Sequence, residues 1–245
     1  MTLTRELSEF GINTTLAHIS DAAWESARIL LLDALGCALA GWQADGCKDV
    51  IEQMQYWGGR AESSLFVLGD KLPMPNAAFA NSVLVHAQDL DDVHIPGILH
   101  ISSIVVPSML AAAESGNVSG REALLGLILG VEIAARIEIP GRSFRRGEGF
   151  LPTSLAGSFG GVMTAARMLG LTAEQCSEAM GINYAQLSGN RQALFSLVAV
   201  LKSMEREEEA MQILRDSGYA DYHTQLLELE LQIALAARPA RDALR

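Results

Sequence analysis

The stretch LPTSLAGSFGGVMTAARML, residues 151–169, decides the fold class. It crowds together small residues at helix-compatible spacing, namely Ala156, Gly157, Ser158, Gly160, Gly161, Ala165 and Ala166. A helix with such a surface lets the backbone of a neighbouring helix approach closely, although each interior glycine costs about 0.5–1 kcal/mol relative to alanine. The stretch therefore predicts a helix that is packed tightly against other helices.

Signals on either side of this stretch predict further helices. Ser20 is an N-cap for a helix that runs to Gly41, and Ser119–Glu122 and Thr172–Gln175 are capping boxes. We expect the second of these three helices to stop before Pro140 and the third to close at Gly181. The one strand candidate is Ser64–Leu68, ahead of a Gly69–Asp70 turn. These signals favour an all-α, multi-helix fold.

The composition changes near residue 195. Glycine becomes scarce, and a charged helical pattern begins at Glu205 and continues with leucines at helical spacing. We therefore divide the chain into a helical domain over residues 1–194 and a divergent amphipathic helical tail over residues 195–245. A solvated helical hairpin and a partner-binding helix both fit the tail.

Charge and composition exclude several classes of protein. The 245 residues carry a formal net charge of −11, which argues against binding nucleic acid. The longest apolar stretch, residues 123–131, is far short of the roughly 20 residues that a membrane span needs. We find no signal peptide, and the 3 widely spaced cysteines are typical of a reduced, cytoplasmic protein.

One segment carries chemistry. It reads His86-Ala-Gln-Asp89-Leu-Asp91-Asp92-Val-His94, followed after five residues by His100. Carboxylates beside imidazoles select a tautomer and allow proton transfer near neutral pH. The same residue types also bind metal ions, although the spacing matches no zinc signature, and they also occur in hydrogen-bonded turns. From residue types alone, all three interpretations stay open.

The order of motifs resembles the MmgE/PrpD family. The matching blocks are Asn81-x4-His86-x2-Asp89-Leu90-Asp91-Asp92-x-His94-x5-His100, Gly130-Val-Glu132-x3-Arg136, Phe150-x-Pro152-Thr153-Ser154-x2-Gly157-x2-Gly160 and Ser188-Gly189-Asn190-Arg191-Gln192. The family contains 2-methylcitrate dehydratases, cis-aconitate decarboxylases and iminodisuccinate epimerases. The resemblance implies a helical domain, an α/β lid further along the chain, a homodimer, and activity without a cofactor.

The resemblance also implies roles for individual residues. His100 would be the acid or base, Asp89 would orient the site or hold a substrate carboxyl, and Asp92 and His94 would support catalysis. Substrate-binding positions would be Asn81, Thr153, Ser154 and Arg191. No metal ligand is assigned. The implied reaction moves a proton at a carbon beside a carboxylate of a di- or tricarboxylate, by lyase (for example dehydratase) or epimerase chemistry.

The sequence departs from the family pattern in several places. Ile101 follows His100 where proline is usual, and Leu151 stands where a histidine is common. We also find neither the lysine-containing segment expected after Gln192 nor the lid, and we expect weak or no catalysis from this chain alone. Arg142, Arg145 and Arg146 form either a compensating cationic cluster or a solvated loop. The alternatives to an enzyme of the family are an inactive helical dimerisation protein and a metal-dependent hydrolase.

Overall fold

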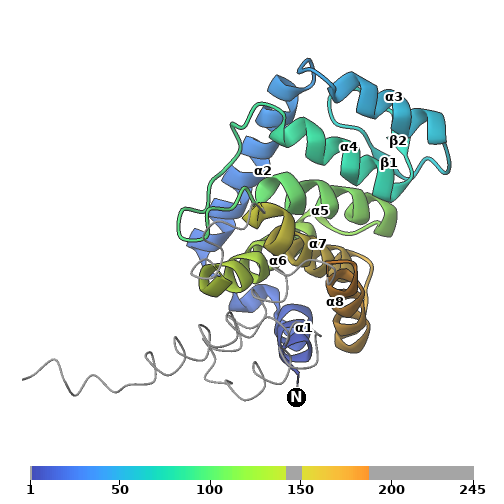
Figure 1. Ribbon diagram of the computed structural model, residues 1–245. Coiled ribbons are helices and arrows are strands. Elements are labelled where there is room, and N and C mark those ends of the chain that lie inside the picture. The colour runs from blue at the N-terminus through green and yellow to red at the C-terminus, as the bar shows by residue number, and fades with distance from the viewer. Residues whose placement is uncertain (1, 142–150, 188–245) are drawn as a thin grey trace, which may run out of the picture.

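The structure is a computed structural model that describes residues 2–141 and 151–187 (Figure 1). Within these ranges the chain is all-α apart from one two-stranded hairpin, as the sequence predicts. The elements are α1 (Leu3–Asn13), the 3-10 helix η1 (Leu16–His18), α2 (Asp21–Gly41), α3 (Cys47–Trp57), β1 (Ser63–Ser64), β2 (Lys71–Leu72), α4 (Met74–His86), α5 (Ser102–Gly116), α6 (Gly120–Gly141), α7 (Pro152–Met168) and α8 (Ala173–Leu187).

The helices form a bundle with the hairpin at one end. Figure 1 shows α3 and the hairpin at the top and α1 beside α8 at the bottom, with α4 to α7 between them. The long helix α2 runs along one side and packs on α4, α5 and α6. The tail over residues 195–245 lies outside the described residues. In the part of the chain that is described, no helix is both long and apolar enough to cross a membrane.

The small residues of α7 allow two helices to cross with their backbones in contact. A Cβ atom added to Gly160 would lie 2.5 Å from the carbonyl oxygen of Gly130 on α6. One turn further along α7, the Thr164 hydroxyl donates a 2.9 Å hydrogen bond to the Gly126 carbonyl oxygen. The prediction that residues 151–169 form a tightly packed helix is therefore confirmed.

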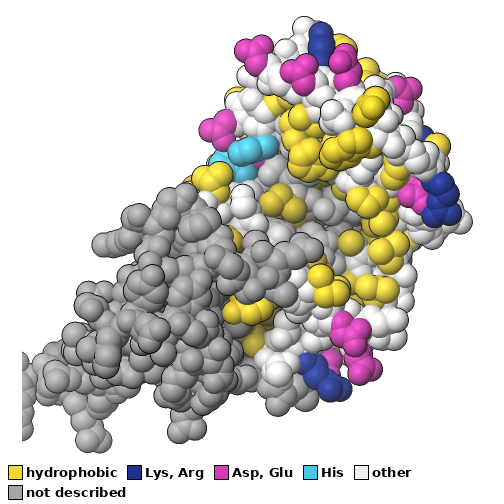
Figure 2. Space-filling model, turned by 45° about the vertical axis from the view of Figure 1, so that its right-hand side comes forward, with side chains coloured by type: hydrophobic (Ala, Val, Ile, Leu, Met, Phe, Trp, Pro, Cys, Tyr) yellow, Lys and Arg dark blue, Asp and Glu magenta, His cyan; other side chains and the backbone are white. Residues whose placement is uncertain are grey.

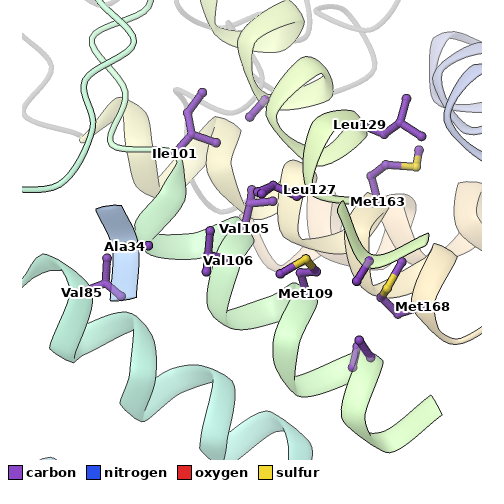
Figure 3. Close-up of a cluster of buried hydrophobic side chains, with 14 of the residues drawn as sticks. Ala34, Val85, Ile101, Val105, Val106, Met109, Leu127, Leu129, Met163 and Met168 are labelled. Carbon is purple, nitrogen blue, oxygen red and sulfur yellow. The ribbon is translucent and has the colours of Figure 1, made fainter. Parts of the chain in front are cut away.

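The core lies where α5, α6 and α7 meet, and it extends to α2 and α4 (Figure 3). The side chains that fill it are apolar and buried; labelled examples are Ala34, Val85, Val105, Val106, Met109, Leu127, Leu129, Met163 and Met168. Ile101, which is 1% exposed, inserts into this core directly after His100. The core therefore fixes one end of the segment that carries the histidines.

Three helix starts follow the predicted caps, but two helix ends do not. At the start of α6, Ser119 Oγ accepts from the Glu122 amide. Ser20 caps α2 by accepting from the Ala23 amide, and Thr172 and Gln175 form the reciprocal capping box of α8. However, α6 continues through Pro140 and α8 continues through Gly181. Burial on both helices outweighs these breakers, because Ile137 is 7% exposed and Met180 is fully buried.

The predicted strand at Ser64–Leu68 is wrong in its extent. The strand pairing covers Ser63–Ser64 with Lys71–Leu72, and residues 66–68 form a turn. The side chain of Asn81 accounts for this, because its Oδ1 accepts from the Phe66 amide at 2.8 Å and its Nδ2 donates to the Ser64 carbonyl at 2.9 Å. A side chain from α4 therefore bonds two backbone groups of the segment that was predicted to be a strand.

Candidate active site

The predicted site lies on the connection between α4 and α5. His86 is the last residue of α4, and His100 stands two residues before α5 begins. Their rings meet edge to face, with centroids 4.9 Å apart. Both side chains reach solvent, at 43% exposure for His86 and 22% for His100, and Figure 2 shows histidine side chains at the surface.

A buried carboxylate lies between the two histidines. Asp91 Oδ1 is 2.9 Å from His86 Nδ1, in a hydrogen bond, and 3.4 Å from His100 Nδ1. The side chain of Asp91 has no exposed surface. Because a carboxylate only accepts hydrogen bonds, Asp91 favours the tautomer of His86 with the proton on Nδ1. His100 Nδ1 faces the same oxygen without a hydrogen bond. That tautomer leaves the Nε2 lone pair of His86 for chemistry, and His100 Nε2 lies on the outer side of the cluster, near Asp89.

Asp89 lies on the outer side of the same cluster. Its carboxylate is 77% exposed, and its Oδ1 is 3.7 Å from His100 Nε2. Its backbone has a positive φ of 53°, in the left-handed region that aspartate tolerates better than most residues. The structure therefore places a solvated carboxylate beside the free nitrogen of His100.

Asp92 holds the start of α5. Its Oδ1 accepts a 2.9 Å hydrogen bond from the Ser102 amide. Burial raises the pKa of its carboxyl above the ordinary 3.8, and the charges of Asp91 and Asp33 add to this effect, whereas hydrogen bonds from Ser102 oppose it. Asp92 thus fixes the backbone where the connection enters α5.

His94 also contacts the backbone, at a tight turn. Its Nδ1 accepts from the Gly97 amide at 3.2 Å, and its own amide and carbonyl pair with Leu99 and Ile98. Leu99 is fully buried, which ties this turn to the core. Within the part of the chain that is described, His94 is not among the side chains that meet around Asp91.

The backbone of His100 is held from both sides. Its amide donates to Thr153 Oγ1 on α7 at 3.0 Å, and its carbonyl accepts from Ser103 Oγ at 2.7 Å. Thr153, for which the resemblance implies substrate binding, is thus seen to hold the backbone of His100. Its neighbour Ser154 is exposed, one residue further along α7.

The remaining predicted substrate-binding positions lie elsewhere. Asn81 is fully buried, and both ends of its amide bond to the hairpin described above. Arg191 lies outside the described residues, as do Arg142, Arg145 and Arg146. No role is assigned to His86 and Asp91 from the sequence, because no pattern in it reveals that Asp91 is buried between two imidazoles.

These features define an all-α domain that displays a histidine–carboxylate cluster on the connection between two helices. Residues 5–206, more than half of the chain, match the MmgE/PrpD N-terminal domain. The chain therefore belongs to the MmgE/PrpD family, which confirms the resemblance seen in its motifs.

The curated relatives include enzymes from fungi and mammals. The chain is 29% identical over 194 residues to a cis-aconitate decarboxylase of Aspergillus terreus, covering 76% of this chain and 39% of the relative. For the human cis-aconitate decarboxylase the identity is 28% over 180 residues, which cover 68% of this chain and 36% of the relative. A cis-aconitate decarboxylase-like protein of Aspergillus oryzae is 25% identical over 201 residues, which cover 76% of this chain and 40% of the relative. The chain thus spans about two fifths of the length of these relatives.

Proposed function

We propose that this chain supplies the acid–base centre of a lyase-type enzyme that acts on a small di- or tricarboxylate. The observation that carries the proposal is the position of Asp91 Oδ1 between the Nδ1 atoms of His86 and His100. A buried carboxylate that orients an imidazole through Nδ1 leaves Nε2 as a base or, once protonated, as an acid. The names of the relatives, which are cis-aconitate decarboxylases, support the substrate class.

The proposed chemistry takes place at a carbon beside a carboxylate. In the dehydration direction, His100 Nε2 accepts the proton, and the electron pair of the C–H bond forms a double bond as the leaving group departs. In a decarboxylation, the C–C bond to the departing carbon dioxide breaks, its electron pair stays on carbon, and the His100 imidazolium delivers the proton. Asp91 positions the ring in both directions, and Thr153 and Ser103 hold the backbone of His100.

The charge of the described site bears on the substrate. Asp89, Asp91 and Asp92 are all carboxylates, so a polycarboxylate substrate needs cations from elsewhere in the protein. Arg191 remains our proposed source of one such contact, with Ser154 as an exposed hydroxyl on the rim. Asp89 would then receive a protonated or hydroxyl-bearing part of the substrate rather than an ionised carboxylate.

Proton exchange tests this proposal. The full chain is incubated in D2O with cis-aconitate, 2-methylcitrate or iminodisuccinate, with a chelator present, and carbon-bound protons are followed by NMR. We expect slow deuterium incorporation into at least one acid, and a loss of about 10²–10⁴-fold in His100→Asn. His18→Asn is the matched control, since His18 is an exposed histidine whose Nδ1 accepts from the Thr15 amide. Exchange only into iminodisuccinate would point to epimerase chemistry instead.

Two results would contradict the proposal. Equal exchange by wild type and His100→Asn would remove His100 from the reaction. Absence of exchange with all three acids, in a chain shown to be folded by circular dichroism, would favour the alternative of an inactive helical dimerisation protein.

We further propose that the chain forms a homodimer. The outer stripe of α2 exposes large apolar side chains, with Ile29 at 58%, Leu32 at 73% and Leu39 at 64% exposure. These residues recur on one side of the helix while its other side packs on α4, α5 and α6. Light scattering after gel filtration should give twice the chain mass for wild type and the chain mass for Leu32→Glu. A monomeric wild type would contradict the proposal.

A further inference from the structure

The cluster around Asp91 has the composition and spacing of a transition-metal site. His86, Asp89, Asp91 and His100 each offer one ligand atom, and these four atoms all lie within 4.8 Å of one another. Asp91 Oδ1 lies 2.9 Å from His86 Nδ1 and 3.4 Å from His100 Nδ1, whereas Asp89 Oδ1 lies 3.7 Å from the other ring nitrogen of His100, Nε2. Zinc–nitrogen and zinc–oxygen bonds of about 2.0–2.2 Å place neighbouring ligand atoms of a tetrahedron roughly 3.3–3.6 Å apart. The contacts of Asp91 Oδ1 with the two Nδ1 atoms, at 2.9 and 3.4 Å, lie close to this range.

The buried carboxylate gives an independent reason to expect a cation. Asp91 Oδ2 and His100 Nδ1 are both buried and make no hydrogen bond within the described residues. The side chain of Asp91 is wholly removed from solvent. A buried carboxylate is stable when it is paired or when it coordinates a metal ion, and one hydrogen bond from a histidine satisfies only one of its oxygens.

The local charge also favours a cation. Three carboxylates, those of Asp89, Asp91 and Asp92, lie on one connection between helices. No lysine or arginine in residues 2–141 and 151–187 forms an ion pair with any of them. Asp89 and His86 are exposed, so an ion would reach the cluster from solvent without any movement of the core.

We propose that His86, Asp89, Asp91 and His100 bind one divalent first-row transition-metal ion, for which zinc is the probe. Two imidazoles with two carboxylates suit zinc, manganese or iron, whereas calcium and magnesium prefer sites made of oxygen ligands. The proposal does not rest on the proposed function. It does use the same histidine, so a bound ion occupies His100 and is expected to slow the proton transfer proposed above.

The first experiment measures binding without any substrate. The full chain is stripped with a chelator, dialysed, and titrated with zinc chloride and, separately, with calcium chloride by isothermal titration calorimetry. We expect one zinc ion per chain and weaker binding of calcium. Cobalt(II), whose visible absorption reports four-coordinate geometry, gives a second readout that does not depend on heat.

Variants assign the site to these residues. Loss of a group that only supports a ligand costs metal proteins about 10–100-fold in affinity, so His86→Asn should weaken zinc binding at least tenfold. Asp91→Asn should do the same, and circular dichroism shows whether that variant folds; His86→Asn decides the question if it does not. His18→Asn should bind zinc as wild type does.

The outcomes separate this inference from the proposed function. The inference is overturned if no saturable zinc binding occurs, or if His86→Asn and His18→Asn bind zinc equally, which would place the ion on other surface carboxylates. Proton exchange in chelator combined with absence of zinc binding would leave the proposed function standing alone. Stoichiometric zinc binding lost in His86→Asn, without exchange into any acid, would leave the metal site standing alone.

Discussion

The crossing of α6 and α7 and the connection over residues 87–101 are stabilised by opposite means. At the crossing, Gly130 and Gly160 bring two backbones into direct contact, with the Thr164 hydroxyl bonded to the Gly126 carbonyl one turn away. An ion pair of Arg167 with Glu122 joins the same two helices further along. On the connection, side-chain hydrogen bonds to backbone groups from Asp92, His94, Thr153 and Ser103 fix the path of the chain.

This difference explains which region can carry chemistry. Close packing leaves no room for a ligand at the crossing, and adding or removing one methyl group there lowers the stability of the fold. The connection is held at its ends by Leu99 and Ile101 in the core, while His86, Asp89 and His100 stay accessible. A positioned acid–base group requires a rigid core that holds its backbone and a solvated, polar segment that displays its side chain.

The largest effect on stability is expected at the crossing. In Gly160→Ala the new Cβ meets the Gly130 carbonyl oxygen, a backbone atom that cannot rotate away, so the helices must separate. We expect a loss of about 3 kcal/mol in the free energy of unfolding, or roughly 6–12 °C in Tm. Urea and thermal denaturation followed by circular dichroism measure both quantities.

Gly181→Ala is the matched control for this substitution. Gly181 also lies inside a helix, but nothing is within 4 Å of an added Cβ. Alanine should therefore stabilise the protein by about 0.5–1 kcal/mol through helix propensity. If both variants lose stability alike, the tight crossing is not the reason for the small residues of α7.

The next largest effect is expected where α7 meets the connection. Thr153→Val removes the acceptor of the His100 amide and leaves a half-buried donor unpaired, which should cost about 1–2 kcal/mol. The exchange reaction should also slow, because the His100 ring loses one of its supports. Thr153→Ser keeps the hydroxyl and should restore both stability and rate. Equal behaviour of the two variants would show that this hydrogen bond does not position His100.

Predictability from sequence follows the same division. Helices at residues 20–41 and 151–169 could be predicted, because apolar spacing, caps and small residues are local signals. The ends at Pro140 and Gly181 could not, because burial of Ile137 and Met180 overrides the breakers. The turn at residues 66–68 depends on Asn81, which is distant in sequence.

The motif located the segment that carries the site, but residue types could not show which of its histidines and aspartates lie together. His86 and Asp91 meet only because the chain reverses after α4 and buries Asp91. His94 is similar to His100 in sequence terms, and yet its Nδ1 is used by a turn. Burial and direction of a side chain on an irregular connection have no periodicity, so the sequence alone leaves them open.

A smaller effect is expected from the charge of Asp92, and it depends on pH. Because burial raises the pKa of this carboxyl in the folded protein, the folded state holds the proton more tightly than the unfolded state. Its contribution to stability therefore falls as pH rises from the ordinary 3.8 through the raised pKa. Asp92→Asn keeps an oxygen for the Ser102 amide and lacks the buried charge.

The stability difference between Asp92→Asn and wild type should thus move in favour of the variant as pH rises through that window, measured by urea denaturation at a series of pH values. Glu62→Gln is a control of opposite sign. A hydrogen bond from the Met74 amide lowers the pKa of Glu62, so its carboxylate stabilises the fold once ionised. If the stability difference between Asp92→Asn and wild type does not vary with pH, burial does not raise the pKa of the Asp92 carboxyl.

The smallest effect on stability is expected at Ile98. Its sign distinguishes the connection over residues 87–101 from the crossing of α6 and α7. Ile98 has a φ of +54°, where any Cβ atom is strained by about 1–2 kcal/mol. Ile98→Gly and Ile98→Ala both remove the half-exposed side chain, but only glycine removes the strain. We expect the glycine variant to be more stable by about 1 kcal/mol, the reverse of the order at Gly181. Denaturation of the two variants tests this, and a more stable alanine variant would show that the connection is not held in a strained conformation.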